Sequence, residues 1–177
     1  APTFALTIAP LAPPATPRPI VAMMASARRN EHALTSGVKT LSYTESVLAL
    51  AHAKAAGADD AIFLDTAGHV CEATASNLFA LLDDVLVTPP LSCGVLPGIT
   101  RAAVLELAPA LGIAVSEREI AEPELATASE IFLTSSIREI APLARIATTA
   151  IGVGRVGPVT AKLIDAYAAL VREECHA

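Results

Sequence analysis

Apolar and polar residues follow one another in runs that predict both strands and helices. An apolar run over Thr3–Leu11 predicts a first strand. The stretch Pro13–Pro19 predicts a linker, because proline does not fit the interior of a helix. A second apolar run over Pro19–Ala27 predicts another strand, and the polar residues Arg28–His32 predict a loop after it. The chain is therefore expected to divide into residues 1–20, a strand with an interdomain linker, and residues 21–177, a single large domain.

Helical spacing of apolar residues first appears over Tyr43–Ala56. Ser42 or Thr44 can cap the beginning of this helix, and Gly57 is suited to end it. Two hairpins are expected next, because short apolar runs are separated by residues that favour turns. The strands of the first are Ala61–Leu64 and His69–Ala75, and those of the second are Asn77–Leu82 and Val85–Val87.

The second half of the chain repeats this mixture of elements. The pattern predicts a loop at Pro89–Pro97, a helix from Gly98 to about Leu111, strands at Ile113–Ile120, Ile131–Thr134 and Ala141–Ile146, a short helix at Pro123–Ala128, and a helix from Gly157 to about Glu174. Strands and helices mix without a strict βαβ rhythm. The expected fold class is therefore mixed α/β or α+β, with a barrel-like sheet as one arrangement.

Composition and charge narrow the possible functions. Apolar residues make up 53% of the 177 residues, but no apolar stretch reaches the length of about 18 residues that a membrane span needs. A net charge of −6 argues against a nucleic-acid partner. The three cysteines form no CxxC pair and the four histidines have no ligand spacing, so neither a disulfide framework nor a metal site is expected. A cytoplasmic location is expected, because the N-terminus lacks a basic leader.

Two charged residues interrupt apolar surroundings and are candidates for chemistry. Lys39 precedes the predicted helix, where loss of solvation and the helix dipole would favour a neutral, nucleophilic amine; a surface loop lysine is the alternative. Glu72 interrupts a strand of small apolar residues, and its carboxylate is either exposed or buried against a cation. Cys71 and Cys93 are interpreted as small core residues rather than nucleophiles.

Two segments could bind an anion. Ile99 and Thr100 follow Gly98 at a predicted helix start, where free amides, a hydroxyl and the helix dipole favour a phosphate group. Ser135 and Ser136 follow a predicted strand and offer hydroxyl groups of the same kind. Neither signal is specific by itself, because many such helix starts are only capped.

Five motifs occur in a fixed order over roughly Arg28 to Leu170: GVKTLSY, EATASNLF, LPGITR, IFLTSSIREI and GPVT. In order and spacing they resemble the fold-type IV pyridoxal-phosphate enzymes, or class IV aminotransferases. This family includes branched-chain and D-amino-acid aminotransferases and 4-amino-4-deoxychorismate lyases. The resemblance implies the large cofactor-binding domain of that fold, a barrel-like mixed sheet flanked by helices, in a homodimeric enzyme.

The resemblance also implies roles for individual residues. Lys39 would form the Schiff base with pyridoxal 5'-phosphate and move the substrate proton, and Glu72 would face the pyridine nitrogen. Tyr43 would approach the ring hydroxyl, Leu96 would contact the ring face, and Asn77 would brace the glutamate strand. The phosphate would be bound by Ile99 and Thr100 together with Ser135 and Ser136.

The resemblance leaves three functional alternatives. The first is an aminotransferase that exchanges the amino group of an amino acid with a 2-oxo acid. The second is a lyase that releases pyruvate and 4-aminobenzoate from aminodeoxychorismate. The third is a catalytically incomplete fragment, because the family's small N-terminal domain, which supplies an arginine to the phosphate, has no counterpart in this chain. Arg28 and Arg29 lie too close to Lys39 in the sequence to match that arginine.

Overall fold

The computed structural model describes residues 4–10 and 18–176. Their helices are α1 (Thr44–Ala55), α2 (Ile99–Ala110) and α3 (Pro158–His176), with 3-10 turns at Leu91–Cys93 and Glu122–Ala126. The strands are β1 (Ile20–Arg28), β2 (Asp60–Leu64), β3 (Val70–Ala73), β4 (Asn77–Leu82), β5 (Val85–Thr88), β6 (Val115–Glu117), β7 (Glu130–Ser135), β8 (Glu139–Ile146) and β9 (Thr149–Ala150). No helix among the described residues is both long and apolar enough to cross a membrane.

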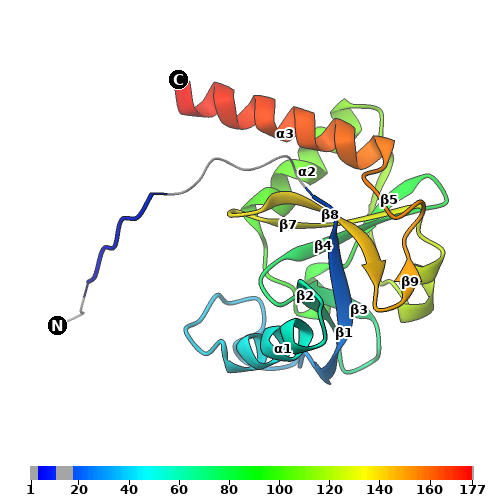
Figure 1. The fold of residues 1–177 in the computed structure, drawn as a ribbon. Helices are drawn as coiled ribbons and strands as arrows, with labels where there is room; N and C mark the ends of the chain where they lie inside the picture. The colour runs from blue at the N-terminus through cyan, green and yellow to red at the C-terminus, as the bar shows by residue number, and fades with distance from the viewer. Residues whose placement is uncertain (1–3, 11–17, 177) are drawn as a thin grey trace.

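The described strands form one mixed sheet in the order β3-β2-β1-β8-β7-β4-β5-β6, with β9 paired to β8. β3 and β4 lie far apart in this order, yet only three residues connect them along the chain. The sheet must therefore curl to bring these two strands together, and Figure 1 shows it wrapped around an interior. Buried aliphatic side chains from most of the strands fill that interior, among them Ile62, Leu78, Leu133 and Leu143. The expected mixed fold with a barrel-like sheet is confirmed.

The helices cover the outer surface of the curled sheet. Ala49 and Ala53 of α1 pack on Phe63 of β2 and on Cys71 of β3. On another part of the sheet, α2 and α3 cover Phe79 and Phe132, whose rings stack with centroids 5.1 Å apart. Figure 1 shows α1 separated from α2 and α3 by the sheet. Small alanines let the helices approach closely, so this alanine-rich chain forms a packed core with few aromatic residues.

Several strands begin or finish at the same edge of the sheet. β1 is parallel to β2 and β8, while β3 and β7 run antiparallel to their neighbours β2, β4 and β8. As a result, β1, β2, β4 and β8 begin at the same end at which β3 and β7 finish. Helix α2 begins beside it, because Gly98 contacts the Asn77 side chain at the first residue of β4. This convergence brings segments distant in the sequence into one place.

The GPVT motif has a structural role at the beginning of α3. The buried carboxylate of Glu130 accepts hydrogen bonds from the amides of Val159, at 3.0 Å, and Thr160, at 2.7 Å. These amides have no partner within the helix, so the carboxylate satisfies them and complements the helix dipole. A Cβ atom on Gly157 would overlap the Glu130 side chain. Glycine is therefore required there by the close approach of the carboxylate.

Most predicted elements are confirmed to within one or two residues, including the three long helices and both hairpins. Asp83 and Asp84 connect the second hairpin with φ values of 47° and 63°, the left-handed pair typical of a type I′ turn. The predicted strand Thr3–Leu11 is wrong over residues 4–10, which form no strand; its two ends and most of the linker Pro13–Pro19 lie outside the described residues.

Three other expectations need correction. The strand predicted at Ile113–Ile120 is shorter, because only Val115–Glu117 pairs with β5. The short helix near Pro123 is a 3-10 helix over Glu122–Ala126. Neither Ser42 nor Thr44 caps α1: its N-cap is Tyr43, with no side-chain capping hydrogen bond. The length of β6 depends on its pairing with β5, a tertiary contact that local periodicity does not contain.

Candidate functional site

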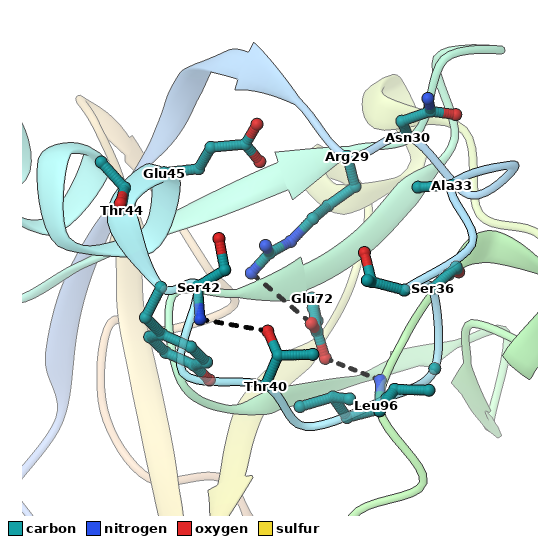
Figure 2. Close-up of a pocket in the computed structure, with 15 residues that line it drawn as sticks. Arg29, Asn30, Ala33, Ser36, Thr40, Ser42, Thr44, Glu45, Glu72 and Leu96 are labelled. Carbon is teal, nitrogen blue, oxygen red and sulfur yellow. Dashed lines mark hydrogen bonds and ion pairs between the residues drawn. The ribbon is translucent and has the colours of Figure 1, made fainter.

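The carboxylate of Glu72 lies at the centre of a cluster of polar contacts. The residue is 5% exposed. Its Oε2 accepts a hydrogen bond from the Leu96 amide at 3.0 Å and a longer one from Asn77 Nδ2 at 3.4 Å. Its Oε1 lies 3.6 Å from Nη2 of Arg29, as Figure 2 shows. Of the two alternatives left open by the sequence, an exposed or a buried carboxylate, the structure shows the buried one with a cationic partner.

Burial and these partners act on the pKa of Glu72 in opposite directions. Burial raises the pKa above its ordinary value of 4.5, because the charged form loses hydration. The Leu96 amide, the Arg29 guanidinium and the Lys39 ammonium group oppose this rise. The net direction is upward, so this carboxylate holds a proton more readily than an exposed glutamate does. A cationic group placed beside it would be strongly favoured by the same low-dielectric surroundings.

Arg29 was not predicted as a site residue, and the structure places it against Glu72. Its guanidinium lies 4.4 Å from the ring centroid of Phe63 and donates a hydrogen bond to Ser46 Oγ at 2.8 Å. Nε of Arg29 is buried without a hydrogen-bond partner among the described residues. In the sequence Arg29 comes directly after a predicted strand, which is a common position for a site residue. Nothing in the sequence, however, indicated that this arginine would face Glu72.

A cavity of about 380 Å³ opens beside this ion pair. Three of the predicted site residues line it: Tyr43, Glu72 and Leu96. The remaining wall comes mainly from the segment between β1 and α1, whose polar side chains Asn30, Ser36, Thr40 and Ser42 surround the opening in Figure 2. A buried carboxylate, a phenol and an apolar side chain thus line the same cavity.

Lys39 lies between Val38 and Thr40, two residues that line the cavity, and is not itself among the lining residues. Its Nζ is 5.0 Å from the ring centroid of Tyr43. The side chain is exposed, so the expected loss of solvation is wrong for the chain as described. Its chain neighbours Val38 and Thr40 and the Tyr43 ring nevertheless line the cavity that contains Glu72, so Lys39 lies beside that cavity.

The amides at the beginning of α2 are free of helical partners. The first bond of this helix joins the Ala102 amide to the Gly98 carbonyl, so the amides of Ile99, Thr100 and Arg101 precede the hydrogen-bonded turn. Thr100 is buried and its Oγ1 lies 3.3 Å from the Tyr167 hydroxyl, whereas Ile99 is exposed. Free amides at a helix start suit an anion, and binding of a phosphate by them stays a prediction.

The predicted second anion segment forms the turn between β7 and β8. Ser135 Oγ accepts a hydrogen bond from the Arg138 amide at 3.1 Å and so stabilises the turn. Ser136 is exposed and its hydroxyl makes no hydrogen bond to the described residues. Just before them, Thr134 Oγ1 is buried and also without a partner in the described part of the chain. Neither serine nor the α2 amides line the cavity beside Glu72.

Asn77 connects the separate parts of the site. Its Nδ2 donates to the Leu96 carbonyl at 2.9 Å as well as to Glu72, and its Oδ1 contacts Gly98. In the sheet, Asn77 lies opposite Thr134, the residue before Ser135. The Asn77 side chain therefore connects the carboxylate to the beginning of α2, and its backbone pairs with the end of β7.

The two buried cysteines, Cys71 and Cys93, are not placed to act as nucleophiles. Cys71 and Cys93 are buried, and Cys71 Sγ donates to the Cys93 carbonyl. Burial raises the pKa of both thiols, that of Cys93 to about 12, so they are protonated at neutral pH. Their interpretation as core residues is confirmed. Within residues 4–10 and 18–176, no three His, Cys, Asp or Glu side chains gather in a way that could hold a metal ion.

A profile of the family described as "Amino-transferase class IV" matches residues 1–146. The chain belongs to the class IV aminotransferase family. The resemblance to this family is therefore confirmed; four of the five motifs lie within the matched residues, and GPVT at residues 157–160 follows them. Residue roles within the family are not tested by this match, and they stay predictions for this chain.

Individual relatives agree with this membership. The branched-chain aminotransferase of Escherichia coli K12 is 38% identical over 132 residues, which are 75% of this chain and 43% of that protein. A solved structure of the Escherichia coli enzyme matches with a TM-score of 0.84 and 35% identity, covering 87% of this chain and 52% of that one. This chain thus spans about half the length of the relative.

Two other solved class IV structures are similar. The branched-chain aminotransferase of Thermobaculum terrenum, solved in its PLP form, matches with a TM-score of 0.84 and 37% identity, covering 88% of this chain and 52% of that one. A Legionella pneumophila protein described as a candidate 4-amino-4-deoxychorismate lyase has a TM-score of 0.82 and 30% identity, over 87% of this chain and 57% of that one. Aminotransferases and a lyase candidate therefore share this fold.

Proposed function

We propose that this chain carries the cofactor-binding part of a pyridoxal-phosphate-dependent aminotransferase, which exchanges an amino group between an amino acid and a 2-oxo acid. The observation that carries the proposal is the cavity beside Glu72, because it places a buried carboxylate, a phenol and an apolar side chain next to Lys39. Family membership supports the same activity. The amino acid proposed first is a branched-chain one, after the names of the relatives.

The donor set fits pyridoxal phosphate. The free amides at the beginning of α2 and the hydroxyl of Ser136 suit a phosphate group, while Glu72 suits a protonated pyridine nitrogen. Leu96 would contact the ring and Tyr43 would approach its hydroxyl. The similar Thermobaculum terrenum enzyme was solved in its PLP form. When bound, the cofactor supplies an aldehyde that condenses with an amine and a ring that accepts electrons.

The protein's own residues would then have distinct tasks. Lys39 would provide the amine that holds the cofactor and, once released, would carry a proton between the Cα atom of the substrate and the aldehyde carbon of the cofactor. Glu72, held by Arg29 and by the Leu96 amide, would keep a proton on the ring nitrogen. The burial of Glu72 provides the water-poor surroundings that its task requires.

We further propose a homodimeric, cytoplasmic enzyme, without nucleic-acid or membrane partners, whose substrates are small molecules. Exposed apolar side chains near the cavity, including Leu34, Val38, Leu41 and Leu48, favour a covering by more protein. The free cysteines favour a reducing compartment. Residues 21–177 would be the large domain of that enzyme, and a small domain of the kind found in the family would complete the other wall of the site.

A lyase acting on aminodeoxychorismate is the second candidate, favoured by the similar Legionella pneumophila protein. The two reactions differ in their need for an amino acceptor. Release of 4-aminobenzoate from aminodeoxychorismate with no 2-oxo acid present would indicate the lyase. Transfer of the amino group of a branched-chain amino acid to a 2-oxo acid would indicate the aminotransferase. Neither product, despite bound cofactor, would indicate a catalytically incomplete chain.

Titration of the purified protein with pyridoxal phosphate tests the site directly. Binding to Lys39 produces visible absorbance, and borohydride reduction followed by peptide mass spectrometry locates the modified residue. We expect Lys39→Ala to abolish both the absorbance and turnover. Lys54→Ala is the matched control, because Lys54 is an exposed lysine on α1 that pairs with Asp59. Modification of Lys54, or retained turnover in Lys39→Ala, would contradict the proposal.

A further inference from the structure

Asp60 is a buried carboxylate to which none of the predicted roles applies. It is 1% exposed at the beginning of β2, on the same face as Ile62 and Leu64, which belong to the core enclosed by the sheet. Its Oδ1 accepts hydrogen bonds from Thr74 Oγ1 at 2.5 Å, from the Thr74 amide at 3.2 Å and from the Ala61 amide at 2.9 Å. These bonds fix the position of the carboxylate and leave Oδ2 available on its other side.

Oδ2 of Asp60 accepts a hydrogen bond from Nη1 of Arg138 at 2.9 Å. The two residues are 78 positions apart in the sequence. Arg138 belongs to the turn between β7 and β8, and its side chain is 39% exposed. A buried carboxylate thus holds a guanidinium from outside the core, and this charged bond is stronger than one between neutral groups. The turn is thereby tied to the end of the sheet at which β2 begins.

The same turn carries the predicted phosphate-binding serines. Arg138 contributes its amide to Ser135 Oγ, and Glu139 closes the turn with a φ of 53°. Ser136 lies between these two anchored ends and has no hydrogen-bond partner among the described residues. Arg138, two residues after Ser136, is therefore bonded to Ser135 through its amide and to Asp60 through its side chain.

We propose that the ion pair between Asp60 and Arg138 positions the β7–β8 turn so that Ser136 can bind the cofactor phosphate. Asp60 and Arg138 are positioning residues that contact neither the ring nor the reacting atoms. This inference rests on the proposed pyridoxal-phosphate function. Its specific consequence is that loss of the ion pair weakens binding of the phosphorylated cofactor and leaves binding of unphosphorylated pyridoxal unchanged.

The test compares pyridoxal phosphate with pyridoxal in the purified protein and in Arg138→Gln. We expect the variant to raise the Kd of pyridoxal phosphate about tenfold, the change that corresponds to about 1.4 kcal/mol. The Kd of pyridoxal should stay within about twofold. A merely structural role would weaken both ligands together, so the ratio of the two Kd values separates positioning from general damage.

Asp60→Asn and the double variant make the test independent of either substitution alone. Both single substitutions remove the same bond. The Kd of pyridoxal phosphate for the double variant should therefore not exceed the higher of the two Kd values of the single variants. Arg118→Gln is the matched control: Arg118 is a half-exposed arginine that pairs with Glu124 and makes no bond to the turn. It should change neither Kd. Melting temperatures of the cofactor-free proteins report on folding.

The outcomes separate the two proposals. A wild-type protein that binds no pyridoxal phosphate overturns the proposed function, and this inference with it. A wild-type protein that binds it, with Arg138→Gln binding equally well, overturns only the role of the ion pair. Equal weakening of pyridoxal and pyridoxal phosphate, or additive effects of the two single variants, also overturns it.

Discussion

A methyl group added at Gly98 should break the hydrogen bonds by which Asn77 holds Glu72 and Leu96 together. Gly98 has φ −68° and ψ 139°, which alanine adopts without strain, so its backbone does not require glycine. A Cβ atom at this position would overlap Oδ1 of Asn77 and lie 3.3 Å from its Cγ. The Asn77 amide would have to move, and it would lose its hydrogen bonds to Leu96 and Glu72.

The expected destabilisation follows from these two bonds. The bond to the Leu96 carbonyl, at 2.9 Å, contributes about 1 kcal/mol. The bond to Glu72 has a charged acceptor but is long at 3.4 Å, so we also take it as about 1 kcal/mol. Alanine is a poorer N-cap than glycine and reduces unfolded-chain entropy, two effects of about 0.5 kcal/mol that oppose each other. Gly98→Ala should therefore lower the free energy of unfolding by about 2 kcal/mol.

Urea unfolding of the cofactor-free protein measures this change, and thermal unfolding should show a melting temperature lowered by roughly 4–8 °C. Asn77→Ala removes the same bonds and should have a similar effect. In the Asn77→Ala background the new methyl group meets no amide, so Gly98→Ala should change stability by less than about 0.5 kcal/mol. Additive effects of the two substitutions would refute the reasoning, and so would an unchanged stability of Gly98→Ala.

Two further predictions concern charged groups near the cavity. Hydrogen bonds from Thr66 lower the pKa of Glu31 from 4.5 to about 2, so its contribution to stability is complete above pH 4.5 and is lost as the pH falls towards 2. The melting-temperature difference between wild type and Glu31→Gln should therefore shrink over that range; a constant difference would contradict this cause. Arg29 opposes the raised pKa of Glu72, so Arg29→Gln should raise that pKa further in a carboxyl NMR titration. Arg28→Gln is the control, since Arg28 bonds the Asp65 carbonyl instead, and an equal shift in both variants would argue against a direct effect of Arg29.

Local patterns were sufficient for most of the helices and strands and for the second hairpin turn. The two short apolar runs on either side of Asp83-Asp84 predicted a hairpin, and the structure has that turn, with positive φ at both aspartates. The beginning of the helix after Gly98 was also predicted, because the residues that indicate a helix start are neighbours in the sequence. Periodicity failed where pairing with a distant strand decides the length, as in β6.

The candidate site was likewise predicted only in part from the sequence, and the rest depended on the tertiary structure. The five motifs identified the family and the candidate residues from the sequence, because each motif is a short run of neighbouring residues in a fixed order. Only the tertiary structure decided that Glu72 is buried against Arg29, that Asn77 joins Glu72 to the beginning of α2, and that Asp60 holds Arg138. Burial and ion pairing depend on which distant segments the curled sheet brings together, and no local pattern of side chains contains that information.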